Sequence, residues 1–203
     1  MQEQEVIKVL KTDLYFNESS INKLKLFTKI LIKANQRHNL ISKNTVIDIW
    51  DRHILDSAQL VKYIDFKDGS LADLGSGAGL PGIVLAIFNR NKDFHVKLYE
   101  KSPVKRKFLK KVVKDLNIDA IILSNIYQEK LYSKYIVCRA FKKIDQVIQV
   151  SREIAKRPHK LIVLKGQNAQ EELNKAFKIK KYDYKLEISI TSNESKIVII
   201  NFN

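Results

Sequence analysis

A glycine-rich stretch at residues 75–82 constrains the fold of this chain more than any other segment. It follows a short, mostly apolar run at 71–74, which has the length of a buried strand. It precedes a second apolar run at 83–88, where a helix is predicted to start. Glycines at such a turn let the backbone bend tightly and let a ligand approach without a Cβ in the way. In a doubly wound sheet the first strand-to-helix turn lies where ligands bind. The stretch therefore predicts a ligand-binding α/β domain.

The order of the other predicted elements supports the same fold class. Residues 1–66 read as helices only, with one at 20–34, capped by Ser19 or Ser20, and one at about 45–63. From residue 70 strands alternate with helices, and the strands are expected at 71–74, 94–99, 120–123, 135–137 and 160–164. Two last strands, 184–190 and 196–200, have no helix between them. We predict one domain, a helical cap at 1–66 and an α/β core at 67–203, whose mostly parallel Rossmann-like sheet ends in an antiparallel hairpin.

Two cofactors compete for the glycine-rich turn. Gly77, Gly79 and Gly82 have the spacing of a dinucleotide-binding motif, so a nicotinamide-dependent oxidoreductase is one candidate. If these three glycines bound a dinucleotide, Asp73 would lie near the end of the preceding strand, where an apolar residue is usual. Asp73 fits better as a carboxylate near the cationic amino-acid end of S-adenosylmethionine. Glu100 ends the second strand and is able to accept both ribose hydroxyls of either cofactor.

Several motifs in fixed order resemble one family. The segment 73–82, the run 52–57 upstream, Lys105-Arg106, the run 139–141 and the run 164–166 resemble the RsmG family, also called glucose-inhibited division protein B. The resemblance covers residues 39–166, and the flanks match in element order only. It implies a class I methyltransferase that transfers a methyl group from S-adenosylmethionine to guanine N7 in 16S ribosomal RNA. The third class, a non-catalytic RNA-binding protein, is disfavoured by the intact glycine turn.

The resemblance also implies which residues contact the cofactor. These residues are Gly75, Leu80, Glu100, Ile126, Tyr127 and Arg139, and Asp73 and Gly77 of the same turn are further candidates for cofactor contact. The chain departs from the family pattern at three places. Tyr127 stands where an acidic residue is usual, which favours a backbone contact or stacking on adenine. Cys138 stands where Ser is common, and Ser195-Lys196 replaces a more basic pair.

The charge of the chain favours a polyanionic partner. Lys and Arg number 37 against 22 Asp and Glu, a net charge of +15, which favours nucleic acid over a membrane surface, although genomic composition alone is able to produce such an excess. Seven basic residues lie between Lys101 and Lys114, where phosphate contact and a plain solvated helix face are equally good interpretations. Arg139 and Lys165 are stronger candidates for RNA contact because each follows a predicted strand. We therefore expect 16S ribosomal RNA or the small ribosomal subunit as partner.

Guanine N7 already has a free lone pair, so its methylation requires no base. We therefore interpret Arg52, His53 and Asp56 as a hydrogen-bonded wall facing cofactor or RNA. Catalysis is expected to come from positioning, with Arg139 and Lys165 the foremost residues. No Cys/His cluster has metal-ligand spacing, so no metal is expected. The lone Cys138, the polar N-terminus and the lack of a long apolar run predict a cytoplasmic protein without a membrane segment, and we expect a monomer.

Overall fold

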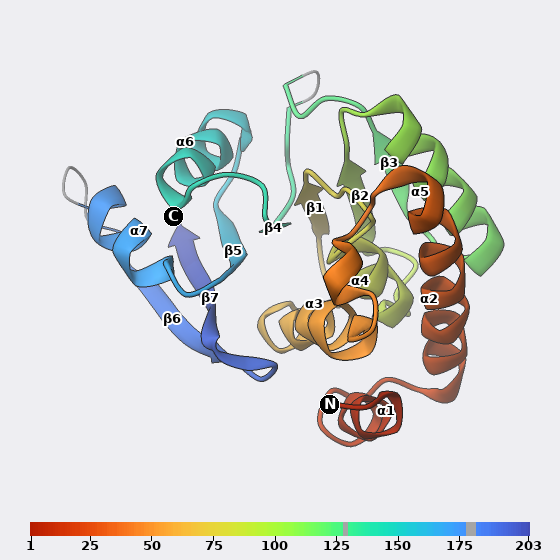
Figure 1. Cartoon of the computed structure of the whole chain (residues 1–203). Coiled ribbons are helices and arrows are strands. Elements are labelled where there is room, and N and C mark those ends of the chain that lie inside the picture. The colour runs from red at the N-terminus through yellow and green to blue at the C-terminus, as the bar shows by residue number, and fades with distance from the viewer. Residues whose placement is uncertain (128–129, 178–181) are drawn as a thin grey trace.

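The computed structural model describes residues 1–127, 130–177 and 182–203, and in it a single mixed sheet organises the chain (Figure 1). Seven strands lie in the order β3-β2-β1-β4-β5-β7-β6. The first five are parallel to one another, and β7 is antiparallel to both β5 and β6. Their bounds are β1 Ser70–Leu74, β2 His95–Tyr99, β3 Ile121–Leu123, β4 Tyr135–Arg139, β5 His159–Lys165, β6 Tyr184–Ser189 and β7 Ser192–Phe202. The predicted fold class, a mostly parallel sheet closed by an antiparallel hairpin, is confirmed.

Helices cover both faces of the sheet. One hydrophobic cluster joins the sheet to the helices α1 (Glu3–Thr12), α2 (Glu18–His38), α4 (Gly82–Phe88) and α5 (Pro103–Leu116). A second cluster joins the opposite face to α6 (Ile144–Ile154) and α7 (Ala169–Ala176). The buried residues of α1 and α2 belong to the same cluster as Leu71 of β1; α2 packs on α4 and α5 of the α/β core, and α1 packs on the helical segment before β1. None of the helices in the described ranges is long and apolar enough to cross a bilayer.

The helical segment before β1 differs from its prediction. The expected helical stretch at about 45–63 consists of a separate 3₁₀ helix η1 (Lys43–Thr45) and a run without a gap through the π-helix η2 (Trp50–Leu55), the short α3 (Asp56–Ala58) and the 3₁₀ helix η3 (Gln59–Tyr63). π-Helical turns are rare and occur often at functional sites, and η2 contains Arg52 and His53. The N-cap of α2 is Asn17, whose side chain accepts a hydrogen bond from the Ser20 backbone 2.8 Å away, and neither Ser19 nor Ser20 has this role.

Candidate functional site

The glycine turn after β1 is held tightly against the end of β2. Gly75 and Ser76 both donate their backbone N–H to the Tyr99 carbonyl, at 2.9 and 3.0 Å. Gly75 has φ +72°, a left-handed conformation that favours glycine, and a Cβ there would lie 2.5 Å from Cδ2 of Phe141. The close neighbour that requires glycine at this position is therefore the Phe141 ring, which follows β4.

A cavity of about 280 Å³ opens at this turn, and we call it the strand-edge cavity. Its lining comes from the turns after β1, β2, β3 and β4: Gly75, Tyr99, Glu100, Lys101, Ser124, Ile126, Tyr127, Phe141 and Lys142. Four residues that sequence analysis selected, Gly75, Glu100, Ile126 and Tyr127, thus lie together around it. The Glu100 carboxylate accepts one hydrogen bond on each oxygen, from Gly77 N–H at 2.9 Å and from Ser102 N–H at 2.8 Å. Because each carboxylate oxygen has two lone pairs, Glu100 keeps acceptor capacity toward the cavity.

Asp73 lies beneath the turn and does not line the strand-edge cavity. Its side chain is fully buried, and Oδ2 accepts a hydrogen bond from the Gly82 backbone, the first residue of α4, at 3.0 Å. Oδ1 is buried without a hydrogen-bond partner among the described residues. Burial raises the pKa of Asp73 to about 7. Asp73 and Leu80 are both buried outside the lining of this cavity, and their contact with the cofactor stays a prediction.

The buried Asp73 carboxyl predicts a pH-dependent stability. Its pKa is about 7 in the folded chain against 3.8 ordinarily, so the folded state binds the proton more tightly, and this stabilisation is lost as the pH rises toward and through 7. Three pKa units correspond to about 4 kcal/mol. Between pH 4 and pH 8 the free energy of unfolding should fall by up to that amount relative to Asp73→Asn, which retains an acceptor for Gly82. Urea unfolding of both proteins measures this, and pH profiles that run parallel would contradict it.

A second hollow, of about 350 Å³, adjoins the ends of β4 and β5, and we call it the cationic pocket. Basic, hydroxyl and backbone groups from the helical segment, β4, β5 and the β6–β7 turn line it: Ser42, Thr45, Arg52, His53, Asp56, Arg139, Ala140, Leu164, Lys165, Gly166, Thr191, Ser192 and Ser195. The four residues predicted to contact RNA, Arg52, His53, Arg139 and Lys165, all lie here. Arg139 was also predicted to contact the cofactor, but it lines this pocket and not the strand-edge cavity.

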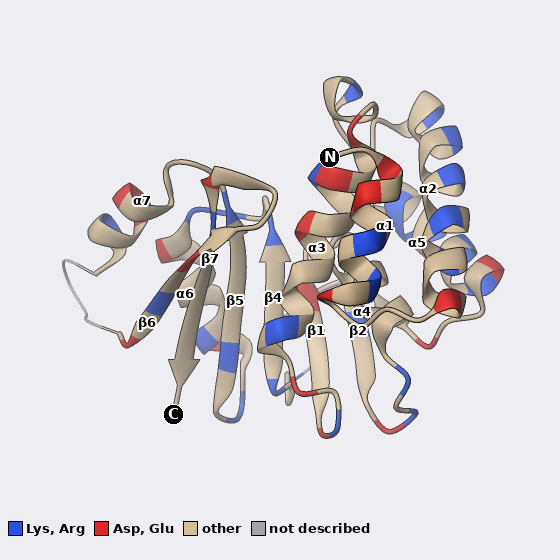
Figure 2. Cartoon of the chain, turned by 90° about the horizontal axis from the view of Figure 1, so that it is seen from below, with Lys and Arg blue, Asp and Glu red and all other residues tan. Residues whose placement is uncertain are grey.

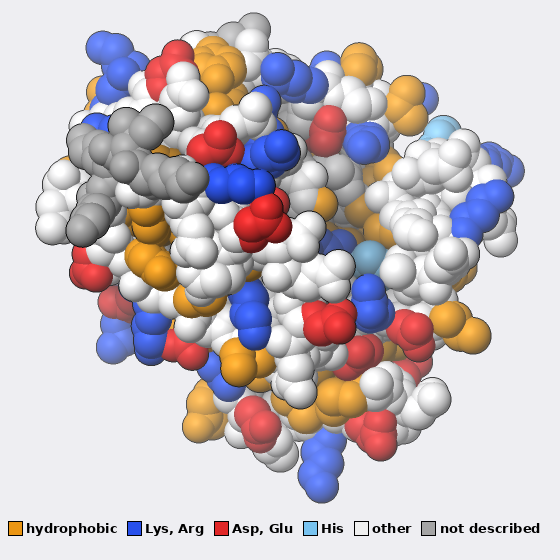
Figure 3. Space-filling view, turned by 60° about the vertical axis from the view of Figure 1, so that its left-hand side comes forward, with side chains coloured by type: hydrophobic (Ala, Val, Ile, Leu, Met, Phe, Trp, Pro, Cys, Tyr) orange, Lys and Arg blue, Asp and Glu red, His pale blue; other side chains and the backbone are white. Residues whose placement is uncertain are grey.

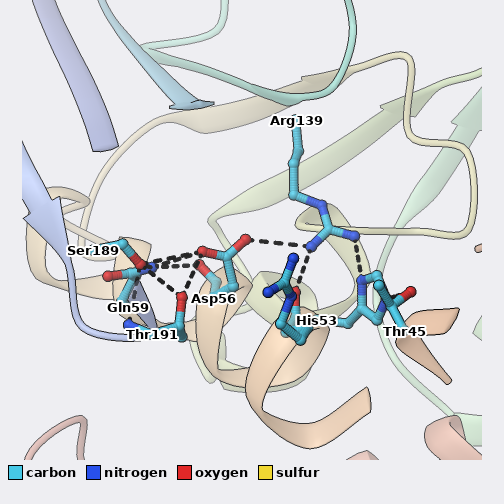
Figure 4. Close-up of polar contacts among 8 residues, drawn as sticks. Thr45, His53, Asp56, Gln59, Arg139, Ser189 and Thr191 are labelled. Carbon is cyan, nitrogen blue, oxygen red and sulfur yellow. Dashed lines mark hydrogen bonds and ion pairs between the residues drawn. The ribbon is translucent and has the colours of Figure 1, made fainter. Parts of the chain in front are cut away.

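Three acceptors fix the Arg139 guanidinium (Figure 4). Nη1 donates to the Arg52 carbonyl at 3.0 Å and to Asp56 Oδ2 at 3.3 Å, and Nη2 donates to His53 Nδ1 at 2.7 Å. Both side chains of the Arg139–Asp56 ion pair are largely buried, with 18% and 14% of the side-chain surface exposed. A largely buried guanidinium that donates to three separate acceptors is held in one position as a hydrogen-bond donor.

His53 is a neutral, fully engaged side chain. Burial, followed by the charges of Arg139 and Arg52, lowers the pKa of His53 to about 3. Since Nδ1 accepts from Arg139, the ring proton is on Nε2, which donates to Thr45 Oγ1 at 2.8 Å. Both nitrogens are therefore occupied, and His53 has no free lone pair with which to remove a proton.

The turn between β6 and β7 completes the support of Asp56. Gln59 Nε2 donates to Asp56 Oδ1 at 3.0 Å and to Ser189 Oγ at 2.8 Å, and Thr191 Oγ1 donates to Asp56 Oδ1 at 3.4 Å (Figure 4). Gln59 Oε1 also accepts the backbone N–H of Ile190 at 3.0 Å. The hairpin at the end of the chain thereby holds the carboxylate that holds Arg139. Sequence reasoning missed Gln59, Ser189 and Thr191, since they lie about 130 residues apart and form no local motif.

Lys165 and Arg52 differ in how freely they are able to meet a ligand. Lys165 Nζ donates to the Lys142 carbonyl and to Glu172 Oε2, both at 2.7 Å, and only 13% of its side chain is exposed. Two of its three ammonium protons are thus engaged within the protein, which leaves one for a ligand. The Arg52 side chain is exposed at the rim of the pocket. Arg52 is therefore the more accessible cation of the two.

The fold and the strand-edge cavity together define the class of protein. An antiparallel β7 inserted between β5 and β6 separates this sheet from the all-parallel dinucleotide-binding order. The residues around the cavity also fit S-adenosylmethionine. The Glu100 carboxylate and the pair Ile126 and Tyr127 line the cavity, and an unpartnered Asp73 oxygen lies under the glycine turn. The fold is similar to that of a SAM-dependent methyltransferase from Aquifex aeolicus (TM-score 0.57, 10% identity, 86% of this chain and 97% of that one). It is also similar to M. jannaschii TYW2 in complex with AdoMet (TM-score 0.52, 16% identity, 73% and 74%). The chain has the fold of the class I S-adenosylmethionine-dependent methyltransferases.

The family follows from comparison of the sequence. The model of the family described as rRNA small subunit methyltransferase G, GidB, matches residues 20–198. Ribosomal RNA small subunit methyltransferase G of Rickettsia felis is 40% identical over 182 residues, which cover 89% of this chain and 93% of the relative. The protein of the same name from Rickettsia prowazekii is 39% identical with the same coverage. This chain belongs to the rRNA small subunit methyltransferase G family, as the resemblance predicted.

Proposed function

We propose that this protein transfers the methyl group of S-adenosylmethionine to N7 of a guanine in 16S ribosomal RNA. The strand-edge cavity is assigned to the donor and the cationic pocket to the guanine. One observation supports this division: the two hollows meet at consecutive residues after β4, because Ala140 lines the pocket and Phe141 lines the cavity. Donor and acceptor bound on the two sides of this turn would face each other across it.

The residues of the strand-edge cavity suit the parts of S-adenosylmethionine, whose sulfonium supplies the methyl group. Glu100 would accept the ribose hydroxyls on its remaining lone pairs, and Ile126 with Tyr127 would border the adenine. Tyr127 is half exposed, so its ring is free to stack. The Asp73 carboxyl would act on the amino-acid end through the glycine turn above it. The assignments of Glu100, Ile126 and Tyr127 follow from the lining of the cavity, and that of Asp73 follows from its unpartnered oxygen under the turn.

The cationic pocket suits a reaction that requires no base. His53 is neutral with both nitrogens engaged, and Asp56 is occupied by Arg139, Gln59 and Thr191. Cys138 is buried next to the pocket's Arg139, and burial raises the pKa of its thiol, which disfavours a nucleophilic role. Guanine N7 attacks with its own lone pair, so the protein must only hold N7 and the methyl carbon about 3–3.5 Å apart. Arg139 would then donate to guanine O6 or a phosphate, and not to N7, which becomes cationic.

We further propose that the partner is 16S ribosomal RNA, as free RNA or within the small subunit, and that the protein acts as a monomer in the cytoplasm. Mapping 7-methylguanine in 16S ribosomal RNA from cells with and without this gene tests the proposed reaction. One guanine should lose its N7 methyl group when the gene is deleted and regain it when the gene is restored. An unchanged 7-methylguanine pattern, with a different methylated base lost instead, would contradict the proposal.

A further inference from the structure

Two neighbouring helices carry most of the excess positive charge of the chain. Together α2 and α5 hold 11 Lys and Arg against 2 Asp and Glu, so 35 residues account for +9 of the net +15. Figure 2 shows Lys and Arg positions spread along both helices, whereas basic and acidic side chains are interspersed on the face in Figure 3. The charge is therefore concentrated on one surface, which compositional drift does not explain because drift would spread it evenly.

The lysines of α5 form a row on its outer side. Phe108, Leu109, Val112 and Leu116 are buried against the sheet. The lysines occupy the opposite side, at the i, i+3, i+4, i+7 spacing that places residues on one helix face: Lys107, Lys110, Lys111 and Lys114. Lys111 is ion-paired with Asp115 at 2.6 Å, and no such pair is found for the other three within the described ranges. Three ammonium groups without an ion pair among the described residues thus project from the exposed side of α5.

The position of the two helices relates this surface to the site. They run in opposite directions (Figure 1), and Lys23 Nζ near the start of α2 donates to the Asn117 carbonyl at the end of α5, at 2.9 Å. The end of α2 therefore lies at the same side as the start of α5. The chain leaves α2 toward Ser42 and Thr45 of the cationic pocket, and it enters α5 from Glu100 and Lys101 of the strand-edge cavity. The basic surface of α2 and α5 is therefore connected through short chain segments to the cationic pocket and to the strand-edge cavity.

We propose that the outer face of α5, with the last turns of α2 that carry Lys33 and Arg37, binds the phosphate backbone of ribosomal RNA outside the methylated nucleotide. This proposal rests on the proposed function, because it assigns the RNA that continues from the guanine in the cationic pocket. A row of lysines neutralises phosphates without reading bases. The surface therefore supplies affinity and alignment, while the choice of the guanine belongs to the pocket.

The test compares two matched triple variants. Lys107→Gln, Lys110→Gln and Lys114→Gln remove three charges from the α5 row, and glutamine preserves helix propensity. Lys8→Gln, Lys62→Gln and Lys67→Gln remove three exposed charges elsewhere. Binding of a 16S ribosomal RNA transcript is measured between about 50 and 300 mM salt. For the α5 variant we expect the slope of log K against log salt to decrease in magnitude by about 2 to 3, with about 10-fold or more weaker binding at 150 mM.

The α5 variant should keep the wild-type Kd for S-adenosylmethionine and the wild-type kcat at saturating RNA, so that only KM for RNA rises. The control variant should change RNA affinity by less than about twofold. Equal losses in both variants, or no loss in either, would overturn the proposal, as would lost binding to phosphatidylserine vesicles with RNA binding intact. If wild-type enzyme forms no 7-methylguanine, the proposed function fails, yet the two RNA affinities still decide the role of α5.

Discussion

The Gly75→Val protein is expected to bind S-adenosylmethionine at least about 100-fold more weakly than the wild type, a loss of about 2.7 kcal/mol. Gly75 has φ +72°, where a β-branched residue is strained, and its Cβ would lie 2.5 Å from the Phe141 ring. Either the ring moves into the strand-edge cavity or the valine methyl groups do. Both outcomes fill the space assigned to the cofactor, since Gly75 and Phe141 line the same cavity.

Isothermal titration calorimetry measures this effect, with Gly166→Ala as the matched control. A Cβ at Gly166 meets nothing within 4 Å, and Gly166 lies outside the strand-edge cavity, so this control should bind the cofactor normally. If Gly75→Val does not fold, Gly75→Ala is measured with and without Phe141→Ala. The second change removes the clashing ring and should restore part of the affinity. Micromolar cofactor binding by a folded Gly75→Val protein would show that the cavity is assigned wrongly.

The sheet could be predicted because its strands are short apolar runs separated by clear helix or turn signals. All seven strands were expected within a few residues, and the unusual end of the sheet followed from two apolar runs with no helix between them. The helices α1 and α7 were missed. Both helices are short. α1 buries three residues and α7 buries two, so the helical periodicity of apolar residues is weak in both segments. The change of helix type along the stretch at about 45–63, from π-helix in η2 to α-helix in α3 and 3₁₀ helix in η3, has no signal in local helix propensity.

The candidate site could be predicted in part. Residues at strand ends, such as Glu100 and Arg139, were found because parallel strands bring their carboxyl ends to one edge. What could not be predicted is how the side chains pair across long distances in sequence. Lys165 lines the cationic pocket, but its hydrogen bonds to the Lys142 carbonyl and to Glu172 could not be predicted. Asp73 was expected near the amino-acid end of the cofactor, and its complete burial, with a hydrogen bond from the Gly82 backbone, could not be predicted.

The assignment of guanine N7 as the methyl acceptor leads to the prediction with the largest expected effect. An RNA whose target guanine lacks N7 should accept no methyl group at all. A methylated exocyclic amine or ring N1 would require a group that accepts a proton, and the cationic pocket offers a neutral His53 with both nitrogens engaged and an Asp56 held by Arg139. Only an acceptor atom with its own free lone pair suits this arrangement. In guanine that description fits N7, N3 and O6, and the family to which the chain belongs favours N7 among them.

The decisive measurement is methyl transfer from labelled S-adenosylmethionine to an RNA substrate in which the target guanine has carbon in place of N7. The altered RNA should bind with about the affinity of the unaltered RNA, because phosphate contacts dominate binding. It should accept no methyl group, while an RNA with inosine at the same position, which retains N7, should still be methylated. Transfer of the label to the RNA that lacks N7 would contradict the assignment of guanine N7 as the acceptor.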